Sequence, residues 1–378
     1  MNKRILIFHY NKVTSYPPVI SLIQNLLKNK HQVGLISFNS TDLPKSILQN
    51  KDFFPINIRF EGSRTPWAIL KRKIFFYRKL KKIVNREMRR YDVLWTTTDF
   101  SVRVLGNLVL KYKHVMQLME LEKKMPLIGK SSFFSYPLDK YAQNAWKVVV
   151  PEINRAYIQK TWWKLKKTPS ILPNKPYSLY SNTKRILSKK EQKYFKEKRK
   201  VVLYLGFVGS DRNLTEFAKA VKKLGTDKYC LYIVGKVDDN MKEKFKNFLS
   251  KNDFVDYLGY YKAPSHLKFL TKAYIGILPY HVDYTHPYLS PLNALYCAPN
   301  KIFEYAGFSV PMVGTDVLGL KIPFEEYGIG ICATEASSEC IAETIKYVDN
   351  NYDSMKSNCK RYFDSIDLDS IVKKILSE

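Results

Sequence analysis

The fold of this chain is decided by a stretch of its second half that begins with Val201-Val202-Leu203-Tyr204-Leu205 and ends with Cys230-Leu231-Tyr232-Ile233-Val234. Both runs are continuously apolar, which is typical of parallel strands that are buried on both faces. The residues between them include Leu214–Leu224, whose apolar positions recur with the period of a helix. A strand, a helix and a second strand in this order predict a βαβ unit and therefore a parallel sheet.

The same alternation extends in both directions along the chain. In the second half, further strand-like runs are Val255–Leu258, Tyr274–Leu278 and Val310–Val313, with helix-like stretches at Met241–Leu249, Pro264–Leu270 and Pro299–Ala306. In the first half, a helix-like stretch covers Pro18–Lys30, and the strand candidates are Arg4–Tyr10, Gln32–Phe38, Asp92–Thr96, His114–Leu118 and Lys147–Val150. Each half therefore predicts its own parallel sheet with helices on its faces.

We expect an α/β protein made of two Rossmann-like, doubly wound domains that face each other across a cleft. The predicted boundaries are residues 1–178 for the first domain, a polar, Lys-rich linker over 179–199, and residues 200–361 for the second domain. The helix-like C-terminal stretch 362–378 is expected to pack back on the first domain. Ligands of such sheets bind beyond the carboxyl ends of the strands.

Composition and charge narrow the class of protein. The chain has 378 residues, and 63 Lys and Arg against 34 Asp and Glu give a net charge of +29. Its N-terminus reads Met1-Asn2-Lys3-Arg4-Ile5-Leu6-Ile7-Phe8 before His9 interrupts the apolar run, so no signal peptide is expected. No run of about 18 apolar residues predicts a membrane-spanning helix. The five cysteines form no C-x-x-C pair, which favours a reducing cytoplasm over a disulfide framework or zinc site.

One segment carries recognisable chemistry, and it runs from Asn293 to Gly307. Pro299 stands where a helix would begin and Gly307 where it would end. The N-terminus of such a helix presents free backbone N–H groups and the positive end of its dipole, which suit a phosphate. Glu304 falls more than one turn inside the helix, where its carboxylate could accept hydrogen bonds from the vicinal hydroxyls of a sugar. An ordinary amphipathic helix with a solvated glutamate is the alternative.

Residues 299–306, followed by Val310-Pro311-Met312-Val313, resemble the donor-site motif of GT-B glycosyltransferases, particularly the GT4-like enzymes of bacterial surface polysaccharide assembly. Further segments resemble that group in the same order along the chain: 203–207 with 212–214, 255–261 with 273–280, and 150–156 with 172–174. The resemblance covers residues 150 to 320 well and the first 145 residues in outline. It implies a GT-B fold, a nucleotide-sugar donor and, as in those enzymes, retention of the anomeric configuration.

The resemblance also implies roles for individual residues of this chain. Glu304 would bind the ribose hydroxyls of the donor nucleotide, and Tyr260 and Tyr261 would lie beside its base. The backbone around Ala298 and Asn300, with Lys301 nearby, would hold the diphosphate, and Gly206 would line this site. Arg212 would stabilise the charge that develops on the leaving nucleoside diphosphate, without a metal ion.

The sequence departs from the family pattern at several positions. The second glutamate of the family's paired motif is replaced by Tyr296, and Asn293 is the candidate substitute for the contact to the donor sugar. On the acceptor side, Asp99 and Glu120 each follow a predicted strand, so either could accept or orient the proton of the acceptor hydroxyl. Carboxylates that merely cap helices or turns are the alternative. The isolated histidines His9, His281 and His286 have no spacing typical of a metal site.

A densely basic stretch runs from Arg64 to Arg90 with apolar residues between its charges. Such a helix is typical of an element that lies on a membrane surface, where each cation near anionic lipid contributes about 1 kcal/mol. A peripheral helix that packs on its own sheet is one alternative, and nucleic-acid binding is another, although no known nucleic-acid-binding motif is present. The predicted membrane and acceptor surface consists of Trp67, Lys71, Arg72, Phe76, Lys79 and Lys82.

Taken together, these patterns predict a cytoplasmic glycosyltransferase, peripheral at the inner face of the membrane, that needs no cofactor or metal ion. Its partners would be a nucleotide-sugar donor, UDP- or GDP-linked, and a glycan or lipid-linked acceptor. The alternative is a non-catalytic protein of the same two-domain fold that binds nucleotides or polyanions. A sugar-nucleotide epimerase is a further option.

Overall fold

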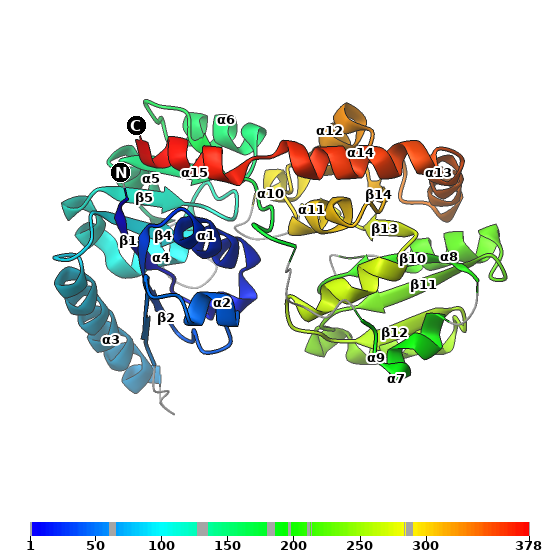
Figure 1. Ribbon diagram of the computed structural model, residues 1–378, viewed down its shortest axis with the longest axis horizontal. Coiled ribbons are helices and arrows are strands. Elements are labelled where there is room, and N and C mark those ends of the chain that lie inside the picture. Colours follow the sequence, from blue (N-terminus) through cyan, green and yellow to red (C-terminus); the bar gives the residue numbers. More distant parts are fainter. Residues whose placement is uncertain are drawn as a thin grey trace. The chain divides into compact units, whose positions relative to one another are not determined.

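The computed structural model contains two α/β units, each built around its own parallel sheet (Figure 1). It describes residues 2–59, 66–126, 135–179, 186–195, 198–209, 212, 214–282, 284 and 290–377, without the side chains of residues 66–71. The first unit comprises Met1–Tyr177, Thr285–Asn293 and Asp367–Glu378, and the second comprises Ser178–Tyr284 and Ala294–Ile366. The chain therefore crosses between the units several times.

The sheet of the first unit has seven parallel strands in the order β3-β2-β1-β4-β5-β8-β9. Its strands are β1 (Arg4–Phe8), β2 (Gln32–Ser37), β3 (Phe53–Asn57), β4 (Val93–Thr97), β5 (His114–Gln117), β8 (Lys147–Val150) and β9 (Ser170–Ile171). The strand order reverses direction between β1 and β4, which is the position where ligands of such sheets bind. A separate antiparallel pair joins β6 (Met125–Pro126) to β7 (Ser135–Tyr136).

The sheet of the second unit has six parallel strands in the order β12-β11-β10-β13-β14-β15, and its order reverses between β10 and β13. Its strands are β10 (Lys200–Leu205), β11 (Tyr229–Val234), β12 (Val255–Gly259), β13 (Ile275–Leu278), β14 (Met312–Thr315) and β15 (Gly330–Ala333). The prediction of two doubly wound parallel sheets is thus confirmed. In the second sheet, β11 is buried along its whole length and β10 is buried apart from Lys200, which explains why both read as apolar runs.

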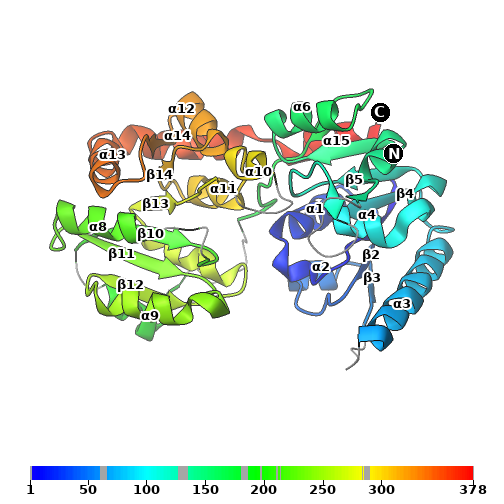
Figure 2. The same ribbon diagram turned by 180° about the vertical axis from the view of Figure 1, so that it is seen from behind.

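Helices cover both sheets (Figure 1, Figure 2). In the first unit they are α1 (Pro17–Lys28), α2 (Lys45–Leu48), α3 (Pro66–Glu87), α4 (Asp99–Leu105), α5 (Leu138–Gln143), α6 (Ile153–Trp162) and α15 (Leu368–Ser377), with 3-10 turns η1 (Val13–Ser15) and η2 (Gly106–Lys111). In the second unit they are α7 (Lys189–Gln192), α8 (Thr215–Leu224), α9 (Lys242–Ser250), α11 (Asn300–Gly307), α12 (Leu318–Tyr327), α13 (Ser338–Asn350) and α14 (Tyr352–Ser365), with 3-10 turns η3 (Lys193–Phe195), η4 (Asp239–Met241) and η5 (Ser265–Lys272). The short helix α10 (Pro291–Leu295) spans a division between the units.

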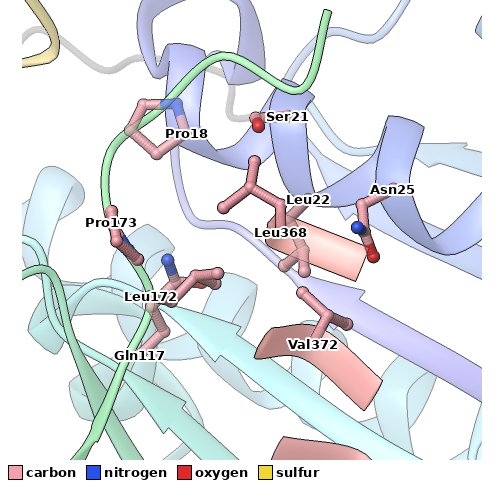
Figure 3. Close-up of a pocket in the computed structure, with 9 residues that line it drawn as sticks. All are labelled: Pro18, Ser21, Leu22, Asn25, Gln117, Leu172, Pro173, Leu368 and Val372. Atoms are coloured by element: carbon pink, nitrogen blue, oxygen red, sulfur yellow. The ribbon is translucent and has the colours of Figure 1, made fainter. Parts of the chain in front are cut away.

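The C-terminal helix α15 belongs to the first unit, where its side chains Leu368 and Val372 pack beside Leu22 of α1 (Figure 3). A single carboxylate oxygen fixes the helix: Asp369 Oδ1 accepts hydrogen bonds from Asn25 Nδ2, Asn29 Nδ2 and Tyr177 Oη, each at 2.8 Å. The cavity left between α1 and α15 measures about 10 Å³, so it has room for roughly one water molecule. It is a packing gap and not a ligand site.

Candidate functional site

In the second unit, three of the predicted donor residues lie near the carboxyl end of β10 and the N-terminus of α11, namely Gly206, Arg212 and Lys301. Tyr305 joins the two elements, because its hydroxyl donates to the carbonyl of Leu203 (2.9 Å) and accepts from the N–H of Leu205 (3.1 Å). The Tyr305 ring lies against Gly276 of β13, where a Cβ atom would come within 2.5 Å of it. The first turn of α11 is thereby held beside the point at which the strand order reverses.

Gly206 directly follows β10 and makes room for a cation. Its φ of +147° is one that side-chain-bearing residues rarely adopt, and a Cβ atom there would lie 2.4 Å from Cε and 2.7 Å from Nζ of Lys301. The lysine of α11 therefore passes over the glycine. The adjoining loop is equally tight, because a Cβ atom at Gly235 would lie 1.6 Å from the carbonyl oxygen of Gly206.

The side chain of Tyr280 contacts a second cation, Arg212, as well as Lys301. The guanidinium carbon of Arg212 lies 4.0 Å from the centre of the Tyr280 ring, a cation–π contact, and Lys301 Nζ lies 3.4 Å from the Tyr280 hydroxyl. Pro299, which precedes α11, offers no side-chain acceptor to the first N–H groups of the helix. Two cations and a helix N-terminus at one strand end form an arrangement that suits a diphosphate. Tyr280 was not among the predicted site residues, although it is the last residue of the segment 273–280, which resembles the same family and contains β13.

Glu304 is buried one turn further into α11, with 7% of its surface exposed. His266 of η5 lies beside it, with Nε2 at 3.4 Å from Glu304 Oε1. Burial by itself raises the pKa of Glu304, but His266 and then Lys301 lower it by more, so the pKa of this carboxyl lies below its ordinary value. His266 Nδ1 is buried without a hydrogen-bond partner among the described residues. The site therefore holds a desolvated, ionised carboxylate, and a solvated glutamate is excluded.

The remaining donor-side predictions have different surroundings. Tyr260 is 59% exposed, whereas Tyr261 packs edge-on against Phe269, with ring centres 4.9 Å apart, and its hydroxyl bonds Glu191. Ala298 and Asn300 lie at the start of α11 and are partly buried. Tyr260 is the more exposed of the two tyrosines, and the place of both beside a nucleoside base stays a prediction.

Asn293 belongs to the first unit, where it organises the loop after β5. Its Nδ2 donates to Glu120 Oε2 (2.9 Å), and its Oδ1 accepts from the N–H of Leu121 (2.8 Å). Arg155 clamps the same loop by donating to the carbonyls of Met119 and Asn293, both at 2.9 Å. The contact of Asn293 to a donor sugar stays a prediction, and the described contacts give it the role of holding Glu120.

Asp99 and Glu122 form a hydrogen-bonded pair of carboxyl groups at the carboxyl ends of β4 and β5. Burial raises the pKa of Asp99, while its hydrogen bonds and Arg103 offset only part of that effect. Burial, then the charge of Asp99 and their shared hydrogen bond, and then the charge of Glu120 raise the pKa of Glu122 to about 8. Both pKa values are raised, which favours retention of a proton by the pair near neutral pH, as an acid/base pair requires. Glu122 was not predicted, although two acidic residues at alternate positions after a buried strand were a visible signal.

The backbone just before this pair is unusual. Thr98 is β-branched yet has a φ of +103°, and its N–H donates to the carbonyl of Gln117 (2.8 Å) while its hydroxyl caps α4 through the N–H of Ser101. A non-glycine residue in such a conformation costs about 1–3 kcal/mol and tends to be retained at functional sites. The conformation of Thr98 therefore sets the direction in which the chain enters α4, whose first residue is Asp99.

The basic helix α3 presents a different set of residues from the one predicted. Phe76 is wrong as a surface residue: it is 8% exposed and packs against Tyr10 and Phe38 of the core. Phe75 is instead 72% exposed, with Arg72, Lys79 and Lys82 also on the exposed side. The one-residue difference arises because the buried stripe continues through Leu80 and Val84. The side chains of Trp67 and Lys71 lie outside the described residues.

In the part of the chain that the structure describes, no group of three or more His, Cys, Asp or Glu side chains could hold a metal ion. Among the helices described, none combines the length and the apolar character needed to cross a bilayer.

Comparison with known proteins gives a fold and no closer assignment. No protein-family model and no curated protein matches the sequence. Among solved structures, a glycosyltransferase from Rickettsia africae is 16% identical over 100% of both chains with a TM-score of 0.67. HepE from Anabaena, in complex with UDP and glucose, is 13% identical over 99% of this chain and 98% of its own, with a TM-score of 0.70. WaaG, a glycosyltransferase involved in lipopolysaccharide biosynthesis, is 14% identical over 99% of this chain and 100% of its own, with a TM-score of 0.58. The chain therefore has the two-domain GT-B fold.

Proposed function

We propose that this protein is a glycosyltransferase that binds a nucleotide-sugar in its second unit and transfers the sugar to a glycan or lipid-linked acceptor of bacterial surface polysaccharide synthesis. One observation carries the proposal: the buried, ionised Glu304 lies on the helix whose N-terminus adjoins Lys301, Arg212 and Gly206. A buried carboxylate next to a cationic phosphate site matches the two ends of a nucleoside diphosphate. Solved structures of the same fold include one with UDP and glucose bound.

The donor would be held by groups of distinct chemistry. Glu304 accepts hydrogen bonds from the two ribose hydroxyls, and Tyr260 supplies a surface on which the base stacks. The first N–H groups of α11, with Lys301 and Arg212, hold the diphosphate. Breaking the sugar–phosphate bond places negative charge on the leaving diphosphate, and these fixed cations stabilise that charge without a metal ion.

The acceptor would be handled by the carboxyl groups of the first unit. The acceptor hydroxyl loses its proton as the new glycosidic bond forms, and the carboxylate of Asp99 can take it up because its pKa is raised while the neighbouring Glu122 already holds a proton. Glu120, held by Asn293, would orient the hydroxyl. Retention of the anomeric configuration is the expected outcome, since the resemblance is to retaining enzymes. An acceptor that is carried by a lipid accounts for the exposed cations and Phe75 of α3, which would place the protein at the cytoplasmic face of the membrane.

The test is a screen of UDP-, GDP-, ADP- and dTDP-sugars, first by thermal shift and then by turnover with and without lipid-linked acceptors. We expect one nucleotide class to stabilise the protein and its sugar to be transferred only when the acceptor is present. Tight nucleotide binding without turnover of any donor would favour the non-catalytic alternative. Conversion of the donor sugar to an epimer without any acceptor would favour an epimerase.

A further inference from the structure

A second site with the chemistry of an anion receptor lies in the first unit, distinct from the strand ends described above. It is a hollow of about 480 Å³ between α3, α4, η2, β7 and α5. Three cationic side chains line it, Lys81, Arg103 and Lys111, together with two tyrosines, Tyr136 and Tyr141. The described residues that line it include no carboxylate, although Asp99 interacts electrostatically with Arg103. A concave surface of one charge attracts a ligand of the other.

Polar groups from three different elements converge at the floor of this hollow. Gly106 has a φ of +56°, and a Cβ atom built on it would lie 3.4 Å from the Tyr136 hydroxyl, 3.5 Å from Lys81 Nζ and 4.0 Å from the Tyr141 hydroxyl. A side chain at this position would occupy the space around which these groups gather. The glycine thus leaves open the point that an ammonium and two hydroxyl groups surround.

The groups around this point are held in place by the fold. The Tyr136 and Tyr141 rings stack with centres 5.5 Å apart, and Tyr141 donates to Asn107 Oδ1 (2.9 Å). Arg103 donates to the carbonyl of Pro126 (2.9 Å), which ties the β6–β7 pair to α4. The Tyr141 hydroxyl thus gives its hydrogen to Asn107, and the Lys81 ammonium and the Tyr136 hydroxyl remain as donors beside Gly106. Donors from separate elements can each reach a different oxygen of a phosphate.

The helix that supplies Lys81 also presents the exposed surface of α3. Phe75 and Ile74 are 72% and 47% exposed, and Arg72, Lys79 and Lys82 are exposed beside them. An exposed aromatic ring among cations is typical of a helix that lies in the interface of an anionic membrane. A phosphate that reaches Lys81 while α3 contacts lipid would therefore be carried by the lipid itself.

We propose that the hollow around Gly106 binds the phosphate group of a membrane lipid, and that this group is the one that carries the acceptor glycan. The second part of the proposal rests on the proposed transferase function, whereas the first part does not. The hollow would fix the lipid anchor of the acceptor while the carboxyl pair at the strand ends handles its reacting hydroxyl.

The experiment measures binding of the full-length protein to phosphatidylcholine vesicles that contain phosphatidic acid, at 150 mM salt as in cells. Lys81→Gln and Lys111→Gln each remove a cation from the hollow, and Lys82→Gln is the matched control because it removes an exposed cation from the same helix. We expect each hollow variant to weaken binding roughly tenfold or more, as loss of a charged hydrogen bond does, and the control to weaken it by no more than about fivefold. Tyr136→Phe, which removes one hydroxyl, should weaken binding without changing charge.

Three results would overturn the proposal. Equal losses in all three lysine variants would show general attraction of cations to the surface. Competition by inorganic phosphate or pyrophosphate at the same concentration as the lipid phosphate would show a site for soluble anions. Unchanged binding in Lys81→Gln and Lys111→Gln would show that the hollow is not used. Nucleotide binding by each variant is measured in parallel, so that failure of the donor site is distinguished from failure of the lipid site.

Discussion

The Glu304→Gln substitution tests the donor site most directly. The change keeps the shape of the side chain but removes the charge of a carboxylate that is 7% exposed. A hydrogen bond to a charged acceptor contributes about 1.5–3 kcal/mol and a neutral one about 0.5–1.5 kcal/mol, so each ribose hydroxyl should lose roughly 1–1.5 kcal/mol. For two hydroxyls the loss is about 2–3 kcal/mol, which corresponds to a roughly 30- to 150-fold weaker nucleotide.

The assay is calorimetric titration of the nucleoside diphosphate that the screen identifies and of its 2′,3′-dideoxy analogue, with both the native and the substituted protein. The native protein should discriminate strongly between the two ligands, and Glu304→Gln should lose most of that discrimination. Glu325→Gln on α12, an exposed glutamate of the same unit, serves as the control. If Glu304→Gln folds and still prefers the ribose form as strongly as the native protein does, the assignment of Glu304 to the ribose is refuted.

Three further predictions concern the first unit. Asp369→Ala should lower the free energy of unfolding by about 2–3 kcal/mol in urea denaturation, because three hydrogen bonds to one oxygen are lost at roughly 1 kcal/mol each; an unchanged midpoint would contradict this anchor for α15. The pKa of Glu122 is raised from its ordinary value of 4.5 to about 8 in the folded protein. The folded protein therefore keeps a proton that the unfolded chain has already released, and the stability that this group contributes at acid pH is lost as the pH rises from about 4.5 to 8. Glu122→Gln should therefore gain stability relative to the native protein over that interval in pH-resolved thermal melts, and parallel curves would show that the pair shares no proton. Phe75→Ser should weaken binding to anionic vesicles at unchanged Tm, whereas Phe76→Ala should cost about 3–5 kcal/mol of stability, and the reverse pattern would overturn the assignment of the two faces of α3.

The strands of both sheets could be predicted from the sequence because parallel strands buried on both faces leave a simple apolar signal. The signal fails at the margins of the sheets. The edge strand β3 reads Phe-Phe-Pro-Ile-Asn, with a proline and mostly exposed side chains, and resembles a loop. The stretch Pro264–Leu270, expected as a helix, forms the 3-10 turn η5, whose apolar spacing over so few residues does not distinguish the two kinds of helix.

The candidate site likewise contains some residues that the sequence indicates and others that it does not. Glu304 and Lys301 could be proposed because they lie on one short motif, and Arg212 because it is a cation in the segment that follows a predicted strand. His266 could not be found, because it reaches Glu304 from a different element and isolated histidines are uninformative in a sequence. The raised pKa values of Asp99 and Glu122 depend on how closely β4 and β5 bring their ends together, which is a property of the folded sheet. The prediction for Phe76 failed because a helix of mixed charge and apolar residues admits two neighbouring stripes, and packing selects one.

The place of α15 in the fold has a consequence for biosynthesis. Because Leu368 and Val372 complete the surface of α1, the unit that the ribosome begins first can finish its packing only after all of the second unit has been translated. Until then, Leu22 and its neighbours stay in contact with water on the nascent chain, available to chaperones. The second unit ends at Ile366 and needs no residue of α15 in order to fold, so it can fold before the first unit is complete. The order of folding would then run opposite to the order of synthesis.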